Sequence, residues 1–306
     1  MSAIIDRILT KLGDKGLIEK LLTLPKSDLN SLLLKVFHKQ AGYSTPADIL
    51  KAFEINRFST PSIIDPVAYH IYEAELLSLA KSLEVEPVLL SPAAPFGSCS
   101  AFGCVDQNNI VSSVRGVEIL PDPTNMLAII IANKLRNKEA DNHRPLHMCS
   151  TARVIRAQPL PPIKGFYSHF GVFCIVSSGK DIGSYACERT LFVKQLLYYK
   201  ELLIRKHNAK LSVVLSKRGG YNDGGSFFEK MTELVKSELP SIPVSVDLEH
   251  KDNSYYKGIN FKLYMEKDNE KIEIGDGGFV DWIQRMTGSK KERCLISGIG
   301  LDRLLI

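Results

Sequence analysis

The sequence predicts an α+β protein in which a helical leader precedes a larger domain of helices and strands. Residues 1–60 have helical periodicity, with helix starts at Ser27 and at Thr45-Pro46. Residues 260–264 and 271–274 alternate apolar and polar side chains, which is the period of a β-strand. Longer segments with helical spacing stand between short apolar runs such as 211–215. We therefore divide the chain into a leader, residues 1–60, and a main domain, residues 61–306.

Composition indicates an ordinary globular chain. The 306 residues are 44% hydrophobic and 24% charged, and the net charge of +5 permits an anionic ligand without indicating a nucleic-acid groove. No apolar run has membrane-spanning length, so we expect no membrane association. The six cysteines are scattered without a CxxC motif, which is typical of reduced thiols in a cytoplasmic protein.

The leader has two interpretations. It is either an appended module that touches RNA or a partner, or a helical subdomain packed on the main domain. We favour the second, because its basic residues are not clustered on one face.

The main domain begins with a helix capped by Asp65, over residues 67–83, followed by an extended segment at 87–90. Helices are also expected at 126–135, 187–206 and 227–239, and a buried strand at 211–215. The glycine-rich stretch 217–226 joins that strand to the last of these helices. We interpret it as a mobile connection rather than a phosphate cradle, because it lacks the GxxxxGK[ST] pattern.

The last fifty residues contain the motifs around which we interpret the rest of the chain. After the two alternating segments come the glycines of 275–278, an expected helix at 279–286 and a short apolar strand at 294–296. A glycine turn at Gly298 and Gly300 then enters a helix that carries Arg303. Glycines let a ligand approach the backbone, and an arginine beside them suits an anion.

Three segments of this region resemble histidyl-tRNA synthetases, in the same order as in that family. Residues 255–261 resemble YYxGxxF, residues 276–281 resemble GGGRYDGL, and residues 298–304 resemble motif 3 of class II aminoacyl-tRNA synthetases, GxGxxR(L). The resemblance implies the class II catalytic core, a largely antiparallel sheet flanked by helices. It also implies a homodimer, because the helix after Asp65 and its strand resemble motif 1.

Motif 2 is matched with departures. Residues 152–156 resemble FRxE(R), and residues 165–173 resemble REFHQFGVE. The resemblance implies that Arg153 holds the α-phosphate, that Tyr167 stacks on adenine, and that Arg303, Gly298 and Gly300 complete the nucleotide site. The family's polar residues are replaced at several positions, which are Ile155, His169, Phe173, Lys251, Phe279 and Val280.

The resemblance also implies a substrate side of the site. Asp122 and Thr124 stand where the family has LRPEGT, whose acid meets the substrate amino group, although a helix cap explains the same residues equally well. Tyr255, Tyr256, Gly277 and Gly278 complete the expected substrate-binding set. Residues 142–149 contain histidine and cysteine in a spacing that matches no known zinc site, so we expect a solvated loop and no metal site.

Two functions stay open. The first is a ligase that uses ATP, with Mg²⁺ as its accompanying ion, to activate an amino acid or other carboxylate as an adenylate, with tRNA, a carrier or a protein partner as acceptor. The second is a non-catalytic paralogue, similar to the regulatory subunit of ATP phosphoribosyltransferase. Ile155 and Phe173 favour the second, since carboxylates are missing there. The chain stops three residues after Arg303, and we expect no anticodon-binding domain.

Overall fold

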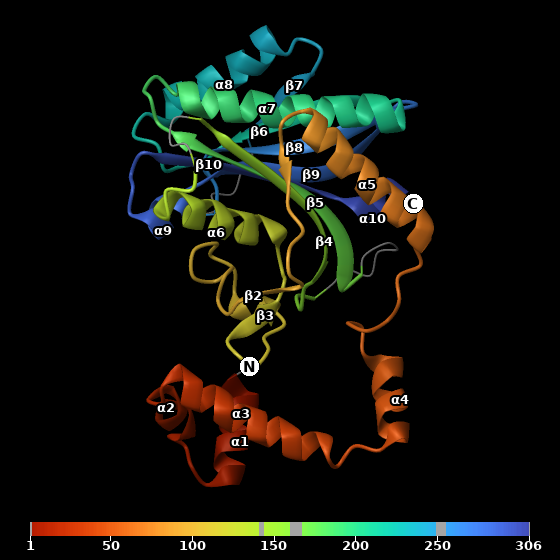
Figure 1. Ribbon diagram of the computed structural model, residues 1–306, viewed down its shortest axis with the longest axis vertical. Helices are drawn as coiled ribbons and strands as arrows, with labels where there is room; N and C mark the ends of the chain where they lie inside the picture. Colours follow the sequence, from red (N-terminus) through yellow and green to blue (C-terminus); the bar gives the residue numbers. More distant parts are fainter. Residues whose placement is uncertain (1, 141–143, 160–166, 249–254, 306) are drawn as a thin grey trace.

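The main domain is built on one eight-stranded sheet. The computed structural model describes residues 2–140, 144–159, 167–248 and 255–305. The strands lie in the order β1-β4-β5-β10-β9-β8-β6-β7, and neighbours are antiparallel except for the parallel pairs β1–β4 and β6–β7 (Figure 1). These strands are β1 Glu86–Pro87, β4 Leu146–Ile155, β5 His169–Lys180, β6 Lys210–Lys217, β7 Val244–Asp247, β8 Lys257–Lys267, β9 Glu270–Val280 and β10 Glu292–Gly300. The expected α+β fold with a largely antiparallel sheet is confirmed.

Helices cover both faces of this sheet. Figure 1 shows α7 and α8 over one side, and α6 and α9 over the other. The first face, which also receives α5, buries Phe173, Leu295 and Phe261, and the second buries Val172, Cys174 and Ile296. Successive strand residues point to opposite faces, so odd and even positions of β5 belong to different cores. The helices are α5 Pro66–Ser82, α6 Pro123–Arg136, α7 Ala186–Leu202 with a π-helical end Leu203–His207, α8 Gly224–Glu238, α9 Trp282–Thr287 and α10 Leu301–Leu305.

Two helix starts follow the sequence prediction closely. Asp65 accepts hydrogen bonds from the backbone N–H groups of Val67 and Ala68 at the start of α5. Thr45 and Asp48 form a reciprocal capping box at the start of α4. The two-stranded sheet of β2 (Ala93–Pro95) and β3 (Val117–Ile119) sits between α5 and α6 in sequence and carries a long loop, residues 96–116.

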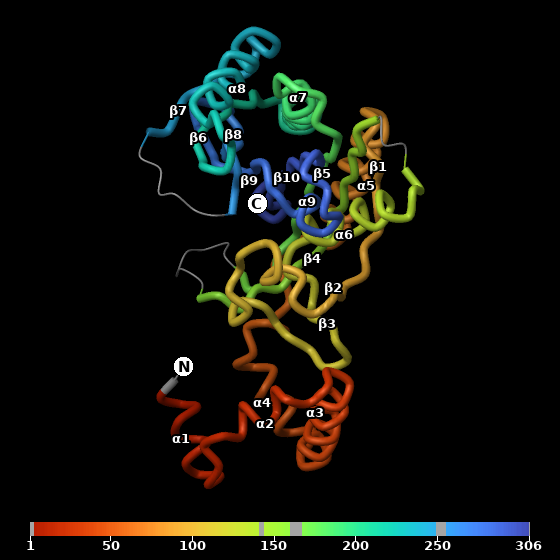
Figure 2. The backbone as a smooth tube through the Cα atoms, turned by 90° about the vertical axis from the view of Figure 1, so that its left-hand side faces the viewer, coloured from red at the N-terminus to blue at the C-terminus, as the bar shows by residue number. Residues whose placement is uncertain are grey.

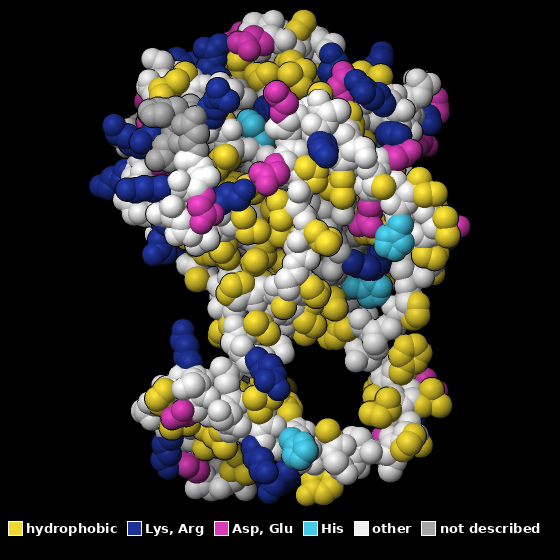
Figure 3. All heavy atoms as spheres, in the orientation of Figure 1, with side chains coloured by type: hydrophobic (Ala, Val, Ile, Leu, Met, Phe, Trp, Pro, Cys, Tyr) yellow, Lys and Arg dark blue, Asp and Glu magenta, His cyan; other side chains and the backbone are white. Residues whose placement is uncertain are grey.

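The leader is helical, as predicted, but it does not pack on the main domain. Its helices are α1 Ser2–Leu12, α2 Leu17–Leu22, α3 Lys26–Ala41 and α4 Pro46–Ile55. No residue between 3 and 60 is buried, and large apolar side chains such as Phe37 and Ile55 are exposed. Figure 2 shows the leader standing below the sheet domain, and Figure 3 shows apolar side chains on its surface. The preferred interpretation of a packed subdomain is therefore wrong.

The leader is tied to the main domain at its end. Arg57 donates hydrogen bonds to the carbonyl oxygens of Ala157 and Gln158 and to the hydroxyl of Ser168. His169 contacts the carbonyl oxygen of Thr60. These contacts hold the chain that follows β4.

Several predicted boundaries in the last fifty residues are wrong. The helix expected from residue 279 begins only at Trp282, because β9 continues through the glycine segment 275–278 to Val280. Gly298 and Gly300 belong to β10 rather than to a turn. Glycine depresses strand propensity, but here both strands are central and each pairs with neighbours on both sides, which overrides the local preference.

Some positions considered from the sequence lie outside the described residues. These are His143, the Gly165-Phe166 part of motif 2, and Lys251. No described helix is both long and apolar enough to cross a membrane.

Candidate functional site

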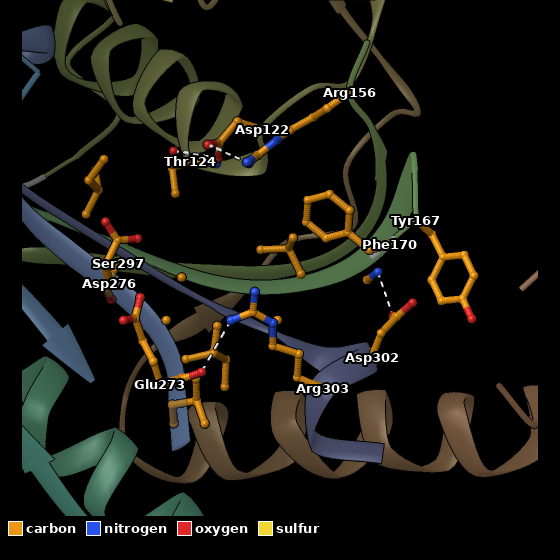
Figure 4. A pocket seen from close by; sticks show the side chains of 18 of the residues that line it. Asp122, Thr124, Arg156, Tyr167, Phe170, Glu273, Asp276, Ser297, Asp302 and Arg303 are labelled. Carbon is orange, nitrogen blue, oxygen red and sulfur yellow. Dashed lines mark hydrogen bonds and ion pairs between the residues drawn. The ribbon is translucent and has the colours of Figure 1, made fainter. Parts of the chain in front are cut away.

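A cavity of about 300 Å³ opens on the sheet face that also carries α6. Its walls come from β9, β10, the start of β5, the N-terminus of α6 and α10 (Figure 4). Most of the residues expected from the sequence meet here, although they come from distant parts of the chain. The lining includes Asp122, Thr124, Arg156, Gln158, Tyr167, Phe170, Tyr255, Tyr256, Glu273, Asp276, Gly298, Gly300, Asp302 and Arg303.

The floor is open because two glycines carry no side chain. A Cβ at Gly298 would lie 3.5 Å from its nearest neighbour, the carbonyl oxygen of Phe173, and one at Gly300 would lie 3.9 Å from Arg303. Neither glycine has a positive φ. Packing and backbone conformation therefore do not require glycine at these positions. The absence of side chains at Gly298 and Gly300 leaves space for a ligand over β10.

Arg303 and Phe170 project into this space. Arg303 lies in α10 and donates a hydrogen bond to the carbonyl oxygen of Glu273 at 3.3 Å. Figure 4 shows its guanidinium and the Phe170 ring pointing into the cavity, while the Tyr167 ring lies at the far edge. A planar cation and an aromatic ring facing one cavity suit a flat, anionic ligand such as a nucleotide.

Asp122 and Arg156 form a pair at the other end. Asp122 caps α6, accepting hydrogen bonds from the N–H of Thr124 at 2.9 Å and from its hydroxyl at 2.7 Å. Its second carboxylate oxygen lies 3.4 Å from Arg156, whose guanidinium also stacks over Phe170 at 5.2 Å. The cap interpretation of Asp122 is confirmed, and the same carboxylate lines the cavity.

Asp276 gives this end of the cavity a negative character. It accepts a hydrogen bond from the Tyr256 hydroxyl at 3.1 Å, and its carboxylate opens into the cavity. Burial raises the pKa of Asp276, and the negative charges of Asp122 and Glu273 act in the same direction. A cationic group bound here would relieve that repulsion. Burial likewise raises the pKa values of Tyr255 and Tyr256 well above their usual range, so both hydroxyls are neutral donors.

Arg153 does not line the cavity. Its side chain lies on the opposite face of the sheet, over the Tyr69 ring of α5, and it pairs with Asp302 at 3.2 Å and with His169 at 2.9 Å. Asp302 also accepts the N–H of Gly171 at 2.8 Å, which fixes α10 to β5. Arg153 therefore positions the helix that carries Arg303, and the structure does not bring Arg153 itself to the cavity.

Gly277 and Gly278 also lie outside the lining. A Cβ at Gly277 would come within 2.4 Å of Phe261, and one at Gly278 within 2.4 Å of Tyr256. These glycines are required for packing between strands. Ile155 and Phe173 are likewise absent from the cavity, and Phe173 stacks on Tyr198 in the opposite core.

Sequence reasoning missed Arg156, Gln158, Phe170, Glu273 and Asp276. A signal for the first two was present, because residues 155–158, Ile-Arg-Ala-Gln, fit FRxE with glutamine in place of glutamate. This frame lies three residues after the one chosen. An odd shift in a strand moves every side chain to the other face, which is why the chosen arginine faces α5.

Solved structures that match this architecture include class II aminoacyl-tRNA synthetases and related proteins. An apo histidyl-tRNA synthetase from S. aureus matches with a TM-score of 0.58 and 12% identity over 80% of this chain and 67% of its own. An ATP phosphoribosyltransferase regulatory subunit/histidyl-tRNA synthetase from Bacillus halodurans matches with 0.60 and 12% over 81% of each chain. A histidine–tRNA ligase subunit from Alicyclobacillus acidocaldarius matches with 0.55 and 14% over 80% and 94%.

The chain therefore has the fold of a class II aminoacyl-tRNA synthetase catalytic domain, as its C-terminal motifs predicted. No family model and no curated protein sequence matches it. At 12–14% identity these likenesses establish the fold alone.

Proposed function

We propose that the cavity binds an adenine nucleotide together with a small molecule that carries an ammonium and a carboxylate, and that the protein joins the two as an adenylate. One observation carries the proposal. Arg303 and Arg156 line the same cavity. Gly298 and Gly300 leave its floor open, although packing requires glycine at neither position. Neither the contacts that a Cβ would make nor the backbone φ requires glycine at these two positions.

The nucleotide end contains Arg303 and Phe170. Adenine would lie between this guanidinium and this ring, since both point into the cavity. Tyr167, expected to stack on the base, lies further out and would contact the rim of the ligand. Arg156 would then contact the α-phosphate, because it is the second guanidinium of the lining.

The substrate end contains the two carboxylates. Asp122 and Asp276 would receive the ammonium group, which places the substrate carboxylate on the side of Arg156. In the reaction a carboxylate oxygen forms a bond to the α-phosphorus, while the bond from that phosphorus to the bridging oxygen breaks and pyrophosphate leaves. Such a step relies on positioning and on neutralising charge, rather than on a side-chain acid or base.

The carboxylates do not form a metal site of their own. Within the described residues, no three histidine, cysteine or acidic side chains converge to hold a metal ion. Glu273 is already paired with Lys262 at 2.9 Å, and Asp302 with Arg153. A magnesium ion would have to arrive on the phosphates of ATP.

A non-catalytic sensor is the second candidate. Gln158 favours a non-catalytic sensor. This residue lines the cavity at the position where FRxE has a carboxylate. An amide is a weaker ligand than a carboxylate for a cation bound to phosphate. A regulatory subunit is also named among the matching structures. In that case the same ligands would bind without turnover.

Exchange of labelled pyrophosphate into ATP separates the two candidates. We expect exchange with at least one of the twenty amino acids, and its loss in Arg303→Ala. Ile49→Ala, an exposed leader position, is the matched control. If no amino acid supports exchange but calorimetry still detects ATP binding, the non-catalytic sensor is the remaining candidate. If ATP does not bind, the assignment of the cavity as a nucleotide site is wrong.

The setting of the protein follows from the same reasoning. The six cysteines are all free, which supports a cytoplasmic location. We also propose a homodimer, with tRNA, a carrier or a protein partner as the acceptor of the activated group.

A further inference from the structure

A second cavity of about 290 Å³ continues from the substrate end of the first. The two share Asp122, Arg156, Gln158, Tyr255, Tyr256 and Asp276. Beyond these shared residues the second cavity is lined by Cys99, Val105, Asn109, Ile110 and Pro121. Its volume is at the low end for a complete small-molecule site but is sufficient for one side chain. A substrate held by Asp122 and Asp276 would therefore extend its side chain into this space.

The described residues that form the far wall of this second cavity carry no charge. Val105 and Ile110 are aliphatic, and burial raises the pKa of the Cys99 thiol, which keeps it protonated. Asn109 is the polar group on this wall, and it is neutral. A charged side chain placed against this wall would lose its hydration without an ion-pair partner on the wall itself, which is unfavourable. An acidic side chain would in addition face the two carboxylates at the entrance.

The wall belongs to a loop that is held in place from several sides. Residues 96–116 connect β2 and β3, and we call them the β2–β3 loop. The buried side chain of Glu118, in β3, accepts hydrogen bonds from the N–H of Gly97, the hydroxyl of Ser98 and the amide of Gln107, at 2.7–2.9 Å. Glu118 is fully buried, so it shapes the loop without touching the cavity.

Two further side chains anchor the same loop. Arg285 of α9 donates to the carbonyl oxygens of Ala101 and Phe102, at 2.9 and 3.0 Å. Asn125 of α6 donates to the carbonyl oxygen of Ser98 at 3.2 Å. The wall is thus fixed before any ligand arrives, and its apolar lining is a feature of the folded protein.

We propose that the β2–β3 loop is the specificity wall of the site, that it selects substrates with an uncharged, mainly apolar side chain, and that Glu118 is its positioning residue. This inference rests on the proposed function. It adds the class of substrate, which the nucleotide end does not determine.

Non-hydrolysable adenylate mimics test it directly. We would measure binding of the leucyl, phenylalanyl, aspartyl and lysyl sulfamoyl adenosines, and of ATP alone, to the full chain by calorimetry. The leucyl or phenylalanyl compound should bind at least about tenfold more tightly than the aspartyl and lysyl compounds. Equal or tighter binding of a charged member would overturn the inference.

Two variants check that the β2–β3 loop is responsible. Val105→Trp, at a partly exposed position, should fill the second cavity and weaken the preferred mimic by about tenfold or more without changing ATP binding. Glu118→Gln should reduce the ratio between the uncharged and charged mimics, again with ATP binding retained. Ile49→Trp in the leader is the control. Unchanged preference in Val105→Trp would contradict the inference, whereas failure of ATP and of every mimic to bind would remove the proposed function itself.

Discussion

Arg153 and Arg156 stand three residues apart at the end of β4 and serve opposite faces of the sheet. Arg153 lies over Tyr69 and pairs with Asp302, on the side of α5, whereas Arg156 reaches Asp122 in the cavity. Because side chains alternate along a strand, an odd separation places the two guanidinium groups on different sides. Whether an arginine at the end of β4 lines the cavity therefore depends on whether its position along the strand is odd or even.

The two arginines should respond differently to substitution. Arg156→Ala should weaken ATP binding by roughly 10- to 100-fold, since loss of a hydrogen bond to a charged group costs about 1.5–3 kcal/mol. Arg153→Ala should lower the melting temperature, because the buried Asp302 loses its cation. Calorimetry and thermal unfolding of both variants measure the two effects. A loss of ATP affinity in folded Arg153→Ala as large as that in Arg156→Ala would contradict this division.

Glycines of the two central strands form a second matched pair. Gly298→Ala should leave stability unchanged or slightly raised, because its Cβ meets only ordinary contacts, yet it should weaken ATP binding by filling the floor. Gly277→Ala should destabilise the fold by about 1–3 kcal/mol, because its Cβ would lie 2.4 Å from Phe261 and 2.5 Å from the carbonyl oxygen of Ile296. Denaturant titration and calorimetry test both. Full ATP affinity in Gly298→Ala would show that the floor does not carry the ligand.

We predict that the folded protein loses stability in acid because of His147. Burial lowers its pKa from 6.5 to about 4, and Lys194 acts in the same direction. The unfolded chain binds a proton at higher pH than the folded chain does, so this contribution is complete above about pH 6.5 and is lost as the pH falls toward 4. Its size is on the order of 2 kcal/mol, less than the full shift implies, because the ring is partly exposed.

Replacement of this histidine tests the assignment. In the unaltered protein the Ser177 hydroxyl lies 2.8 Å from Nδ1 of the His147 imidazole. His147→Gln keeps a hydrogen-bond donor near this hydroxyl. The variant should show a flatter dependence of unfolding free energy on pH between 4 and 6.5. An unchanged slope would mean that other groups set the acid response. His70, on the exposed face of α5, provides the control substitution.

The proposed homodimer is testable in solution. Val67 and Ile71 of α5 expose 66% and 56% of their surface, in the helix that resembles motif 1. Light scattering should give twice the chain mass of 34.1 kDa at micromolar concentration. Ile71→Glu should shift this toward the monomer, since it places a charge in an apolar contact. Val246→Glu, on the distant strand β7, should not. A monomer in the unaltered protein would rule the proposal out.

The sequence by itself determined the type of fold and several helix starts. Asp65, Asp122 and Thr45 act as caps because a short polar side chain can satisfy the free N–H groups of the next turn, and this depends only on neighbouring residues. The strand at residues 260–264 was likewise visible from alternation, and Phe261 and Leu263 are both fully buried. The C-terminal motifs predicted the class II architecture for the same reason, since their glycines and arginine lie close together in the chain.

Only the tertiary structure decided which of these residues meet. Gly277 and Gly298 are indistinguishable in sequence, yet one is required by Phe261 and the other leaves a cavity open. The choice between Arg153 and Arg156 depended on the register of β4 against β5, which pairs Arg153 with Gly171 and turns both toward Tyr69. Register and facing depend on partners far away in sequence, so local pattern cannot fix them. The leader shows the same limit, because its helical periodicity says nothing about whether a partner surface exists for it in this chain.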